Sequence, residues 1–167
     1  MTKGKTTGYF SGLNKAMRKI VLSLLNRDAL CKLFYYDDFD PLSKPSLTQD
    51  EKDHLLETKI ATIPTFPFED YKGSFMIFAF DTFNINDTNP KFINQTFGID
   101  IYCHKDLWKI ANGQMRPFLI LDEVHQILED SNMFGIGRVK FITSSMNVLN
   151  SEMMGYITKY RNIDFDR

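Results

Sequence analysis

The string with the clearest potential for catalysis is Asp-Glu-Val-His at residues 122–125, which follows three apolar residues. In ATP-hydrolysing enzymes, adjacent acids of this kind hold Mg²⁺ and polarise the attacking water. Such an enzyme also needs a glycine-rich loop and a lysine to hold the phosphates, but residues 4–6 (Gly-Lys-Thr) lack the earlier glycine of that motif. Pro117 suits the first turn of a helix, which predicts that the string forms one face of a packed helix. A small nucleotide-handling hydrolase remains an alternative, with a site built on Asp122, Glu123 and His125.

Other candidate ligands and nucleophiles are scattered along the chain. The three histidines, His54, His104 and His125, are widely separated, whereas the ligands of zinc sites follow one another at short spacings. Cys103 and His104 are neighbours on a predicted strand, so their side chains point to opposite faces and do not easily share a metal. No Gly-x-Ser-x-Gly motif marks a nucleophilic serine. We therefore predict no catalytic, cofactor-binding or metal site, no cofactor, and a protein that is not an enzyme.

The overall composition fits one domain with a hydrophobic core. The chain has 167 residues, of which 43% are hydrophobic, and its net charge is −1. A nearly neutral chain is not a nucleic-acid binder by composition, so no specific nucleic-acid binding is predicted. The chain has two cysteines, no apolar signal-peptide region near its start and no apolar run of about 20 residues. These features predict a soluble protein that is synthesised in a reducing cytoplasm and does not enter a membrane.

Charge is distributed unevenly along the first third of the chain. Residues 1–36 carry seven basic side chains and one acid, a net charge of +6. Residues 37–57 carry seven acids and two lysines, a net charge of −5. Three arrangements are open: the two segments pair within one molecule, each faces solvent, or each meets the opposite charge on a neighbouring subunit.

Three helices are predicted in this first part of the chain. Apolar residues recur at helical spacing over 11–25, which indicates an amphipathic helix. Its basic side chains lie on the polar face: Lys15, Arg18 and Lys19. A second short helix is predicted over 26–34, followed by a loop rich in proline and acids. The sequence Thr-Gln-Asp-Glu at 48–51 fits a capping box, so a third short helix is expected to follow it.

Strand patterns dominate the rest of the chain. Apolar and polar residues alternate over 97–104, as expected for a strand with one buried face. Further strands are predicted over 59–63, 74–83, 138–145 and 155–165, with a loop over 84–91 and a helix over 117–129. The predicted fold class is α+β: an antiparallel sheet of four to five strands with one helix packed on it, preceded by N-terminal helices. The predicted parts are an N-terminal basic helical arm with an acidic loop (1–57) and an α+β core domain (58–167).

Several features follow one another in order over residues 60–129. They are Ile63-Pro64, Gly73 before a long strand, an asparagine-rich loop, the strand FGIDIYCH, Trp108, and Arg116 just before the helix PFLILDEVHQIL. This arrangement resembles the tail terminator (tail completion) proteins of long-tailed bacteriophages. The resemblance implies a small α+β domain that assembles into a ring, usually a hexamer, which caps the tail tube and joins it to the neck. Head-closure and head–tail adaptor proteins of the neck are related alternatives.

The resemblance also implies partners and a location. The partners would be other copies of the chain, the tail tube protein, and a neck or head-closure protein, with DNA passing through the ring. The location would be the virion, after synthesis in the host cytoplasm. Because a ring subunit must contact its neighbours, charged residues are expected at these contacts: Lys15, Arg18, Lys19, Lys91 and Arg116. A regulatory adaptor that uses the basic helix against an acidic partner or nucleic acid is a third hypothesis.

Overall fold

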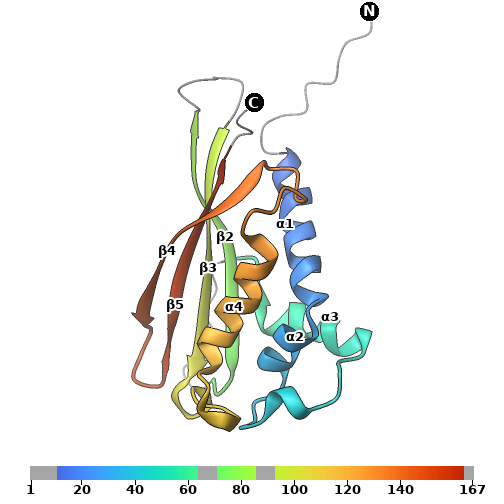
Figure 1. The fold of residues 1–167 in the computed structure, drawn as a ribbon, viewed down its shortest axis with the longest axis vertical. Helices are drawn as coiled ribbons and strands as arrows, with labels where there is room; N and C mark the ends of the chain where they lie inside the picture. The colour runs from blue at the N-terminus through green and yellow to red at the C-terminus, as the bar shows by residue number, and fades with distance from the viewer. Residues whose placement is uncertain (1–10, 64–70, 86–92, 164–167) are drawn as a thin grey trace, which may run out of the picture.

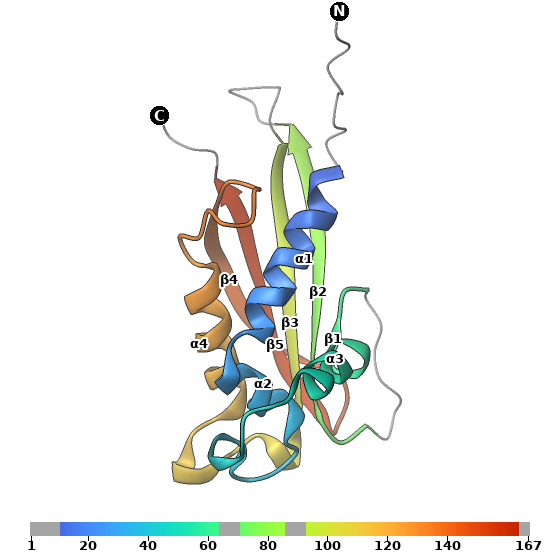
Figure 2. The same ribbon diagram turned by 90° about the vertical axis from the view of Figure 1, so that its right-hand side faces the viewer.

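The chain folds into a twisted sheet with its helices on one face (Figures 1 and 2). The structure is a computed structural model that describes residues 11–63, 71–85 and 93–163. Its helices are α1 (Ser11–Leu25), α2 (Asp28–Tyr35), α3 (Gln49–Thr58) and α4 (Arg116–Leu128). Its strands are β1 (Ile60–Ala61), β2 (Ser74–Ile85), β3 (Ile93–His104), β4 (Arg138–Val148) and β5 (Met153–Ile163). The predicted α+β class, with helices preceding the sheet, is confirmed.

The sheet has the strand order β1-β2-β3-β5-β4. Neighbouring strands from β2 to β4 are antiparallel, as predicted. The first strand requires a correction, because β1 runs parallel to β2, with Ile60 opposite Met76 and Ala61 opposite Ile77. A parallel pair needs a connection of about a dozen residues that returns the chain to its starting end. The segment between β1 and β2 is long enough to do this, and the sheet is therefore mixed.

The hairpin of β4 and β5 is longer than the sequence predicts, because the two strands meet at a tight turn. Asn150 Oδ1 accepts hydrogen bonds from the backbone N–H groups of Glu152 and Met153, each at 2.8 Å. An asparagine side chain that binds the backbone in this way stabilises a turn. At the other hairpin, the predicted loop at 84–91 begins inside β2, which ends at Ile85. The rest of that loop lies outside the described residues.

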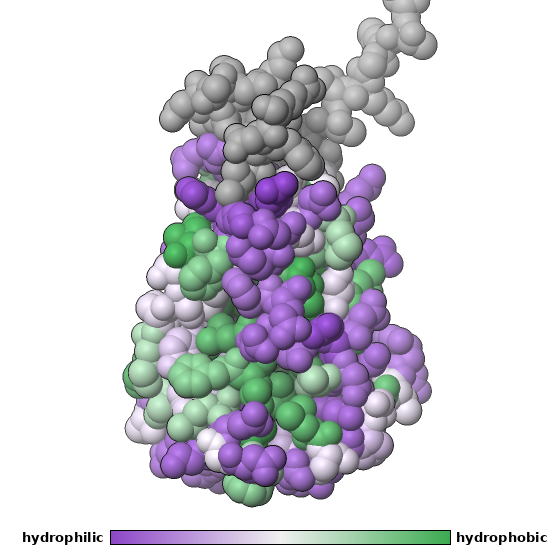
Figure 3. Space-filling model, in the orientation of Figure 1, coloured by the Kyte–Doolittle hydropathy of each residue, from purple (hydrophilic) through white to green (hydrophobic). Residues whose placement is uncertain are grey.

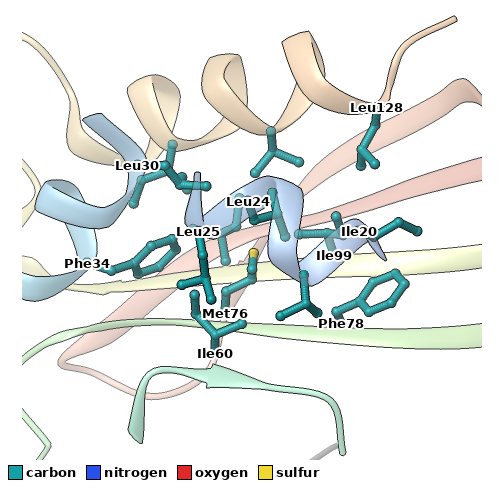
Figure 4. Close-up of a cluster of buried hydrophobic side chains, with 14 of the residues drawn as sticks. Ile20, Leu24, Leu25, Leu30, Phe34, Ile60, Met76, Phe78, Ile99 and Leu128 are labelled. Atoms are coloured by element: carbon teal, nitrogen blue, oxygen red, sulfur yellow. The ribbon is translucent and has the colours of Figure 1, made fainter. Parts of the chain in front are cut away.

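One hydrophobic core lies between the helices and the sheet (Figure 4). Ile20 and Leu24 of α1 are fully buried in it, as are Phe78 of β2 and Ile99 of β3. Full burial of an apolar side chain of this size contributes roughly 1.5–3 kcal/mol to folding. The core contains side chains from both sides of the boundary predicted between residues 57 and 58. α1 and α2 are therefore packed as part of the same core as the sheet.

Helix α3 begins with the predicted capping box. Thr48 Oγ1 accepts from the N–H of Glu51 at 3.3 Å, and Glu51 Oε2 accepts from the N–H of Thr48 at 2.7 Å. The hydrogen bond from the Thr48 backbone is the main cause that lowers the pKa of Glu51.

Replacing Thr48 with alanine removes one partner of this box. We expect Thr48→Ala to lower the free energy of unfolding by about 1 kcal/mol, because one N–H at the start of α3 loses its acceptor. Urea denaturation followed by circular dichroism measures this. The matched control is Thr62→Ala, at an exposed threonine outside the helix. An equal loss in both variants would show that the cap contributes nothing.

Candidate subunit interface

The basic residues predicted at subunit contacts separate into exposed, buried and undescribed positions. Lys15, Arg18 and Lys19 lie on the solvent side of α1 and are exposed. Lys19 Nζ also donates to the carbonyl oxygen of Met133 at 3.2 Å. Lys91 lies outside the described residues. α1 therefore presents a basic face to solvent while its apolar side is buried in the core.

Arg116 lies inside the protein, so its predicted place at a subunit contact is wrong. Its side chain has 0% of its surface exposed. Arg116 Nε donates to the carbonyl oxygen of Leu107 at 3.0 Å, and Nη1 donates to those of Leu33 at 2.6 Å and Tyr36 at 3.0 Å. Nη2 donates to the carbonyl oxygen of Asp38. A guanidinium held by four backbone groups of its own chain cannot reach a neighbour.

The end of α2 explains why a cation is buried there. The last carbonyl groups of a helix have no partner within the helix and carry a partial negative charge. Besides Arg116, Lys59 binds this end: its Nζ donates to the carbonyl oxygen of Phe34 and to the carboxylate of Asp37, each at 2.8 Å. Burial lowers the pKa of Arg116, but an arginine in a protein keeps its charge. Two cations thus fasten the end of α2 to the starts of α4 and β1.

The Asp-Glu-Val-His string lies on α4, where its acids and its histidine have different partners. Glu123 accepts from Arg27 Nε at 2.7 Å and so ties α4 to the start of α2. Asp122 is exposed. The ring of His125 packs edge-on against Phe141 of β4, with 5.7 Å between the ring centroids. Gln126 links the two acids, because it donates to Asp122 Oδ2 at 2.8 Å and accepts from Arg27 Nη2 at 2.8 Å. Asp122 and Glu123 thus belong to one network around Arg27, whereas His125 contacts β4.

The two cysteines lie in the core. Cys31 and Cys103 are free and buried, and burial raises the pKa of each thiol to about 11. Each thiol is therefore almost fully protonated at neutral pH, and neither is an activated nucleophile. Within residues 11–63, 71–85 and 93–163, no group of three His, Cys, Asp or Glu side chains is placed to hold a metal ion. No helix in these ranges is long and apolar enough to span a bilayer.

Strand β4 forms one outer edge of the sheet. In the described part of the chain it pairs with β5 alone. From Phe141 to Val148 the sequence contains no charged residue and no proline. Its charges, Arg138 and Lys140, stand at the start of the strand, and its one irregularity lies between Phe141 and Thr143. Natural proteins usually protect a long edge with charges, prolines, bulges or a covering element. The segment after α4 covers the start of this edge: the backbone of Val139 bonds that of Ser131 and Asp130, each at 2.9 Å, and the N–H of Phe141 donates to the Glu129 carboxylate at 2.7 Å. Within the described residues, the rest of β4 up to Val148 pairs with β5 alone and is open to another strand.

Exposed and half-buried apolar side chains flank this edge on the helix side, and we call them the α4–β4 patch: the exposed Phe118, Met146 and Val148, and the half-buried Tyr156 and Trp108. Phe118, Met146 and Val148 have 52%, 56% and 59% of their surface exposed. Met146 lies opposite Tyr156 in the ladder, and the ring of Phe118 lies 5.5 Å from that of Tyr156. Figure 3, which looks onto α4 and β4, shows hydrophobic surface over the lower part of both elements. Aromatic residues and methionine are enriched at protein interfaces, so the patch has the composition of a binding surface.

The sheet face opposite the helices carries a partly buried acid, Asp100 of β3. Lys159 and Asp81 form an ion pair at 2.7 Å on the same face. Burial is the main cause that raises the pKa of Asp100; Lys159 lowers it and Asp81 raises it further. A carboxyl group whose pKa is raised by folding favours the folded state while protonated, and this contribution is lost as the pH rises through the folded pKa.

An ionised Asp100 destabilises the folded state, and asparagine cannot ionise, so replacing Asp100 with asparagine removes this destabilisation. We expect Asp100→Asn to raise the thermal stability at pH 7, and the gain to shrink as the pH falls towards the ordinary aspartate value of 3.8. Thermal denaturation across that pH range measures the difference. Asp81→Asn is the control, because it removes the ion pair with Lys159 and should give no gain. A less stable Asp100→Asn at pH 7 would contradict the argument.

A strand is predicted from the sequence over 138–145, but neither its position at the edge of the sheet nor the α4–β4 patch is. Two signals for them are nevertheless present. One is the uncharged run over 141–148. The other is Phe118, which falls off the buried stripe of α4 formed by Ile120, Val124 and Leu128. Neither signal indicates an edge until the order of the strands is known.

Comparison with known proteins gives one match. The model of the YomW family matches residues 28–162, which span α2 to nearly the end of β5. No curated protein and no solved structure matches the chain significantly. The matched segment contains nearly the whole sheet, the buried Arg116 and the α4–β4 patch. The chain therefore belongs to the YomW family, a phage-type family.

Proposed function

We propose that this protein is a structural component of a phage particle: a tail terminator whose copies form a ring at the end of the tail tube and join the tail to the neck. Its partners would be other copies of itself, the tail tube protein, and a neck or head-closure protein. The phage-type family supports an origin in a phage. The order of features over residues 60–129 supports the specific role. Head-closure and head–tail adaptor proteins are the alternatives within the neck.

The observation that carries this proposal is the open edge of β4 with the α4–β4 patch beside it. Contiguous exposed apolar surface on a folded domain marks a site of contact with another protein. A subunit of a ring contacts two neighbours through two different surfaces. The basic face of α1, with Lys15 and Arg18, is a second surface available for such contacts. A protein whose described surfaces are built for contact fits a structural role.

Particles of the encoding phage provide the test. We expect mass spectrometry to find this protein in purified particles, and electron microscopy to find unjoined heads and tails when the gene is deleted. The wild-type gene and Met133→Glu should restore joined particles, whereas Met146→Glu should not. Met133 and Met146 are both exposed, at 63% and 56%, but only Met146 belongs to the α4–β4 patch. Joined particles that form without the protein would rule the proposal out.

The hydrolase alternative predicts a different result. A hydrolase built on Asp122, Glu123 and His125 should bind ATP with Mg²⁺ and lose that binding in Glu123→Gln. Isothermal titration calorimetry of the purified protein measures it. We expect no specific binding, because these side chains contact different parts of the fold.

A further inference from the structure

Two exposed helix faces of opposite charge lie on one side of the molecule. We propose that two copies of this protein pair through this side, about a two-fold axis, so that the basic face of α1 in each copy meets the acidic face of α3 in the other. This pairing goes beyond the proposed function, because a two-fold contact closes after two copies, whereas a ring contact passes from each copy to the next.

The basic face of α1 contains all the charged residues of that helix. Lys15, Arg18 and Lys19 are exposed, and α1 contains no acid, so its net charge is +3. Ile20, which is fully buried, lies two positions from both Arg18 and Leu22. Residues two positions apart on a helix point about 200° apart, so Arg18 and Leu22 point away from the core. The exposed face thus consists of three bases with Leu22 beside them.

The exposed face of α3 has the opposite charge. The helix contains four acids and one lysine, so its net charge is −3. Asp50, Asp53 and Glu57 are exposed and recur at helical spacing, which places them in one acidic stripe. Leu55 lies two positions from both Asp53 and Glu57 and is fully buried, so the stripe points away from the core. The face of α3 therefore equals that of α1 in charge and has the opposite sign.

Neither face finds an ion-pair partner in the part of the chain that the structure describes. No ion pair there joins a base of α1 to an acid, and none joins an acid of the α3 stripe to a base. Lys19 donates to the carbonyl oxygen of Met133, and Asp53 accepts from the side-chain amide of Gln49. Both of these partners are uncharged. The charges of the two faces therefore do not pair within one molecule, and a second copy offers each face a partner of opposite sign.

The arrangement of the helices allows both contacts to form in one pair of copies. Figure 2 looks onto α1 and α3 together, and Figure 1 shows both helices on the side of the molecule away from β4. Helix α2 packs against each of them and so holds them in one layer. A two-fold axis through this layer places α1 of each copy on α3 of the other, so the contact is made twice. Strand β4 stays uncovered and available for contacts in a particle.

Charge selects the orientation of the pair, and apolar side chains add to the contact. Two α1 faces would repel each other, as would two α3 faces, so only the crossed arrangement brings opposite charges together. Leu22 in α1, Leu42 before α3 and Ile63 after β1 have 47%, 37% and 66% of their surface exposed. Exposed ion pairs contribute little stability each. We therefore expect a weak dimer, with a dissociation constant on the order of tens of micromolar at low salt.

Sedimentation velocity at two salt concentrations tests the pairing. We expect the wild-type protein to sediment mainly as a dimer at about 100 μM in about 50 mM NaCl. In about 500 mM NaCl its dissociation constant should rise at least about tenfold, because salt screens exposed charges. A monomer at low salt would overturn the proposal, and so would a dimer that is indifferent to salt. Species that grow beyond a dimer as the concentration rises would rule out the two-fold arrangement.

Charge reversal tests whether α1 of one copy meets α3 of the other. Lys15→Glu with Arg18→Glu makes α1 net acidic, and Asp53→Lys with Glu57→Lys makes α3 net basic. Each of these two proteins should sediment as a monomer, because its α1 and α3 then carry charges of the same sign. An equimolar mixture of the two should form a dimer, because each basic helix again meets an acidic one. A mixture that stays monomeric would contradict the pairing of α1 with α3.

A matched control reverses two exposed bases outside α1. Lys109→Glu with Arg161→Glu changes the net charge by as much as the α1 variant does, and should leave the dimer intact. Circular dichroism establishes that each variant is folded. If the control were monomeric as well, the net charge of the protein and not the face of α1 would govern association, and the proposal would be wrong.

Nucleic acid is the other partner whose charge suits the basic face of α1. Fluorescence anisotropy with labelled double-stranded DNA, at the same low salt, measures this binding. We expect the α1 reversal to change dimer formation and not DNA binding. A wild-type protein that stays monomeric and binds DNA through Lys15 and Arg18 would assign the face to nucleic acid and overturn the proposal.

These results are independent of the proposed function. A protein that fails to dimerise in solution can still be found in particles. A protein that is absent from particles can still be tested for the dimer. The two proposals can therefore fail separately.

Discussion

Replacing Arg116 with methionine is expected to lower the free energy of unfolding by about 3–5 kcal/mol. The substitution leaves the backbone carbonyl groups of Leu107, Leu33, Tyr36 and Asp38 without their donor. Each buried polar group without a partner costs about 1–3 kcal/mol, and part of that cost is relieved where water can enter. A loss of this size is a large share of the 5–15 kcal/mol that is typical for a domain. Guanidinium denaturation followed by circular dichroism measures it.

Two other variants test whether the loss of stability comes from the buried hydrogen bonds of Arg116. Arg116→Lys keeps the charge but replaces a planar fork with a single ammonium group, which cannot span four carbonyl groups. It should recover only part of the loss. Arg18→Met makes the same change as Arg116→Met at an exposed position on α1, and should stay within about 0.5 kcal/mol of the wild type. If Arg116→Met were as mild as Arg18→Met, the buried contacts of Arg116 would not stabilise the fold.

Replacing Gly155 with alanine is expected to destabilise the sheet by at least the 1–3 kcal/mol usual for overpacking. Gly155 lies in β5, opposite Tyr102 of β3 and Asn147 of β4. A Cβ atom at this position would lie 1.7 Å from the carbonyl oxygen and 2.7 Å from the carbonyl carbon of Ile101. Both atoms belong to the backbone of a central strand, so relief requires β3 and β5 to move apart. That movement breaks ladder hydrogen bonds, and the loss should appear as a lower denaturation midpoint.

Gly98 of β3 provides the matched control. It lies in the interior of a strand like Gly155, but a Cβ atom there would meet Asp100 Oδ1 at 3.5 Å and the carbonyl oxygen of Thr158 at 3.9 Å. These are ordinary contacts. Replacing such a glycine with alanine reduces the freedom of the unfolded chain, so Gly98→Ala should be neutral or stabilise by about 0.4–1 kcal/mol. Equal destabilisation by both variants would mean that loss of glycine, and not the close approach to Ile101, is the cause.

Variants at buried residues and variants at exposed residues should change different properties of the protein. Arg116 and Gly155 are buried, so their substitution should act on folding at any protein concentration. Met146 is exposed in the α4–β4 patch, so its substitution should act on association and leave the unfolding of the monomer nearly unchanged. A loss of assembly in Met146→Glu without a loss of stability is the result expected of an interface residue.

The elements with strong local signals could be predicted from the sequence. The apolar stripe of α1, the capping box of α3, the alternation along β3 and the proline at the start of α4 all lie in the predicted elements. Each of these signals involves residues within about one turn of helix or a few residues of strand. The sequence alone therefore determined the element types and the α+β class.

The roles of Arg116 and β4 were decided by the tertiary structure. An arginine at the start of a helix has the same local sequence whether it faces solvent or the end of another helix. It is buried here because α2, far away in sequence, brings its unpartnered carbonyl groups to it. In the same way, an uncharged run of residues becomes an open edge only because β5 lies between β3 and β4 in the sheet. Whether a strand lies at an edge, and whether a side chain is buried, depends on contacts between distant segments. The periodicity of apolar residues within one segment does not depend on those contacts and so cannot indicate them.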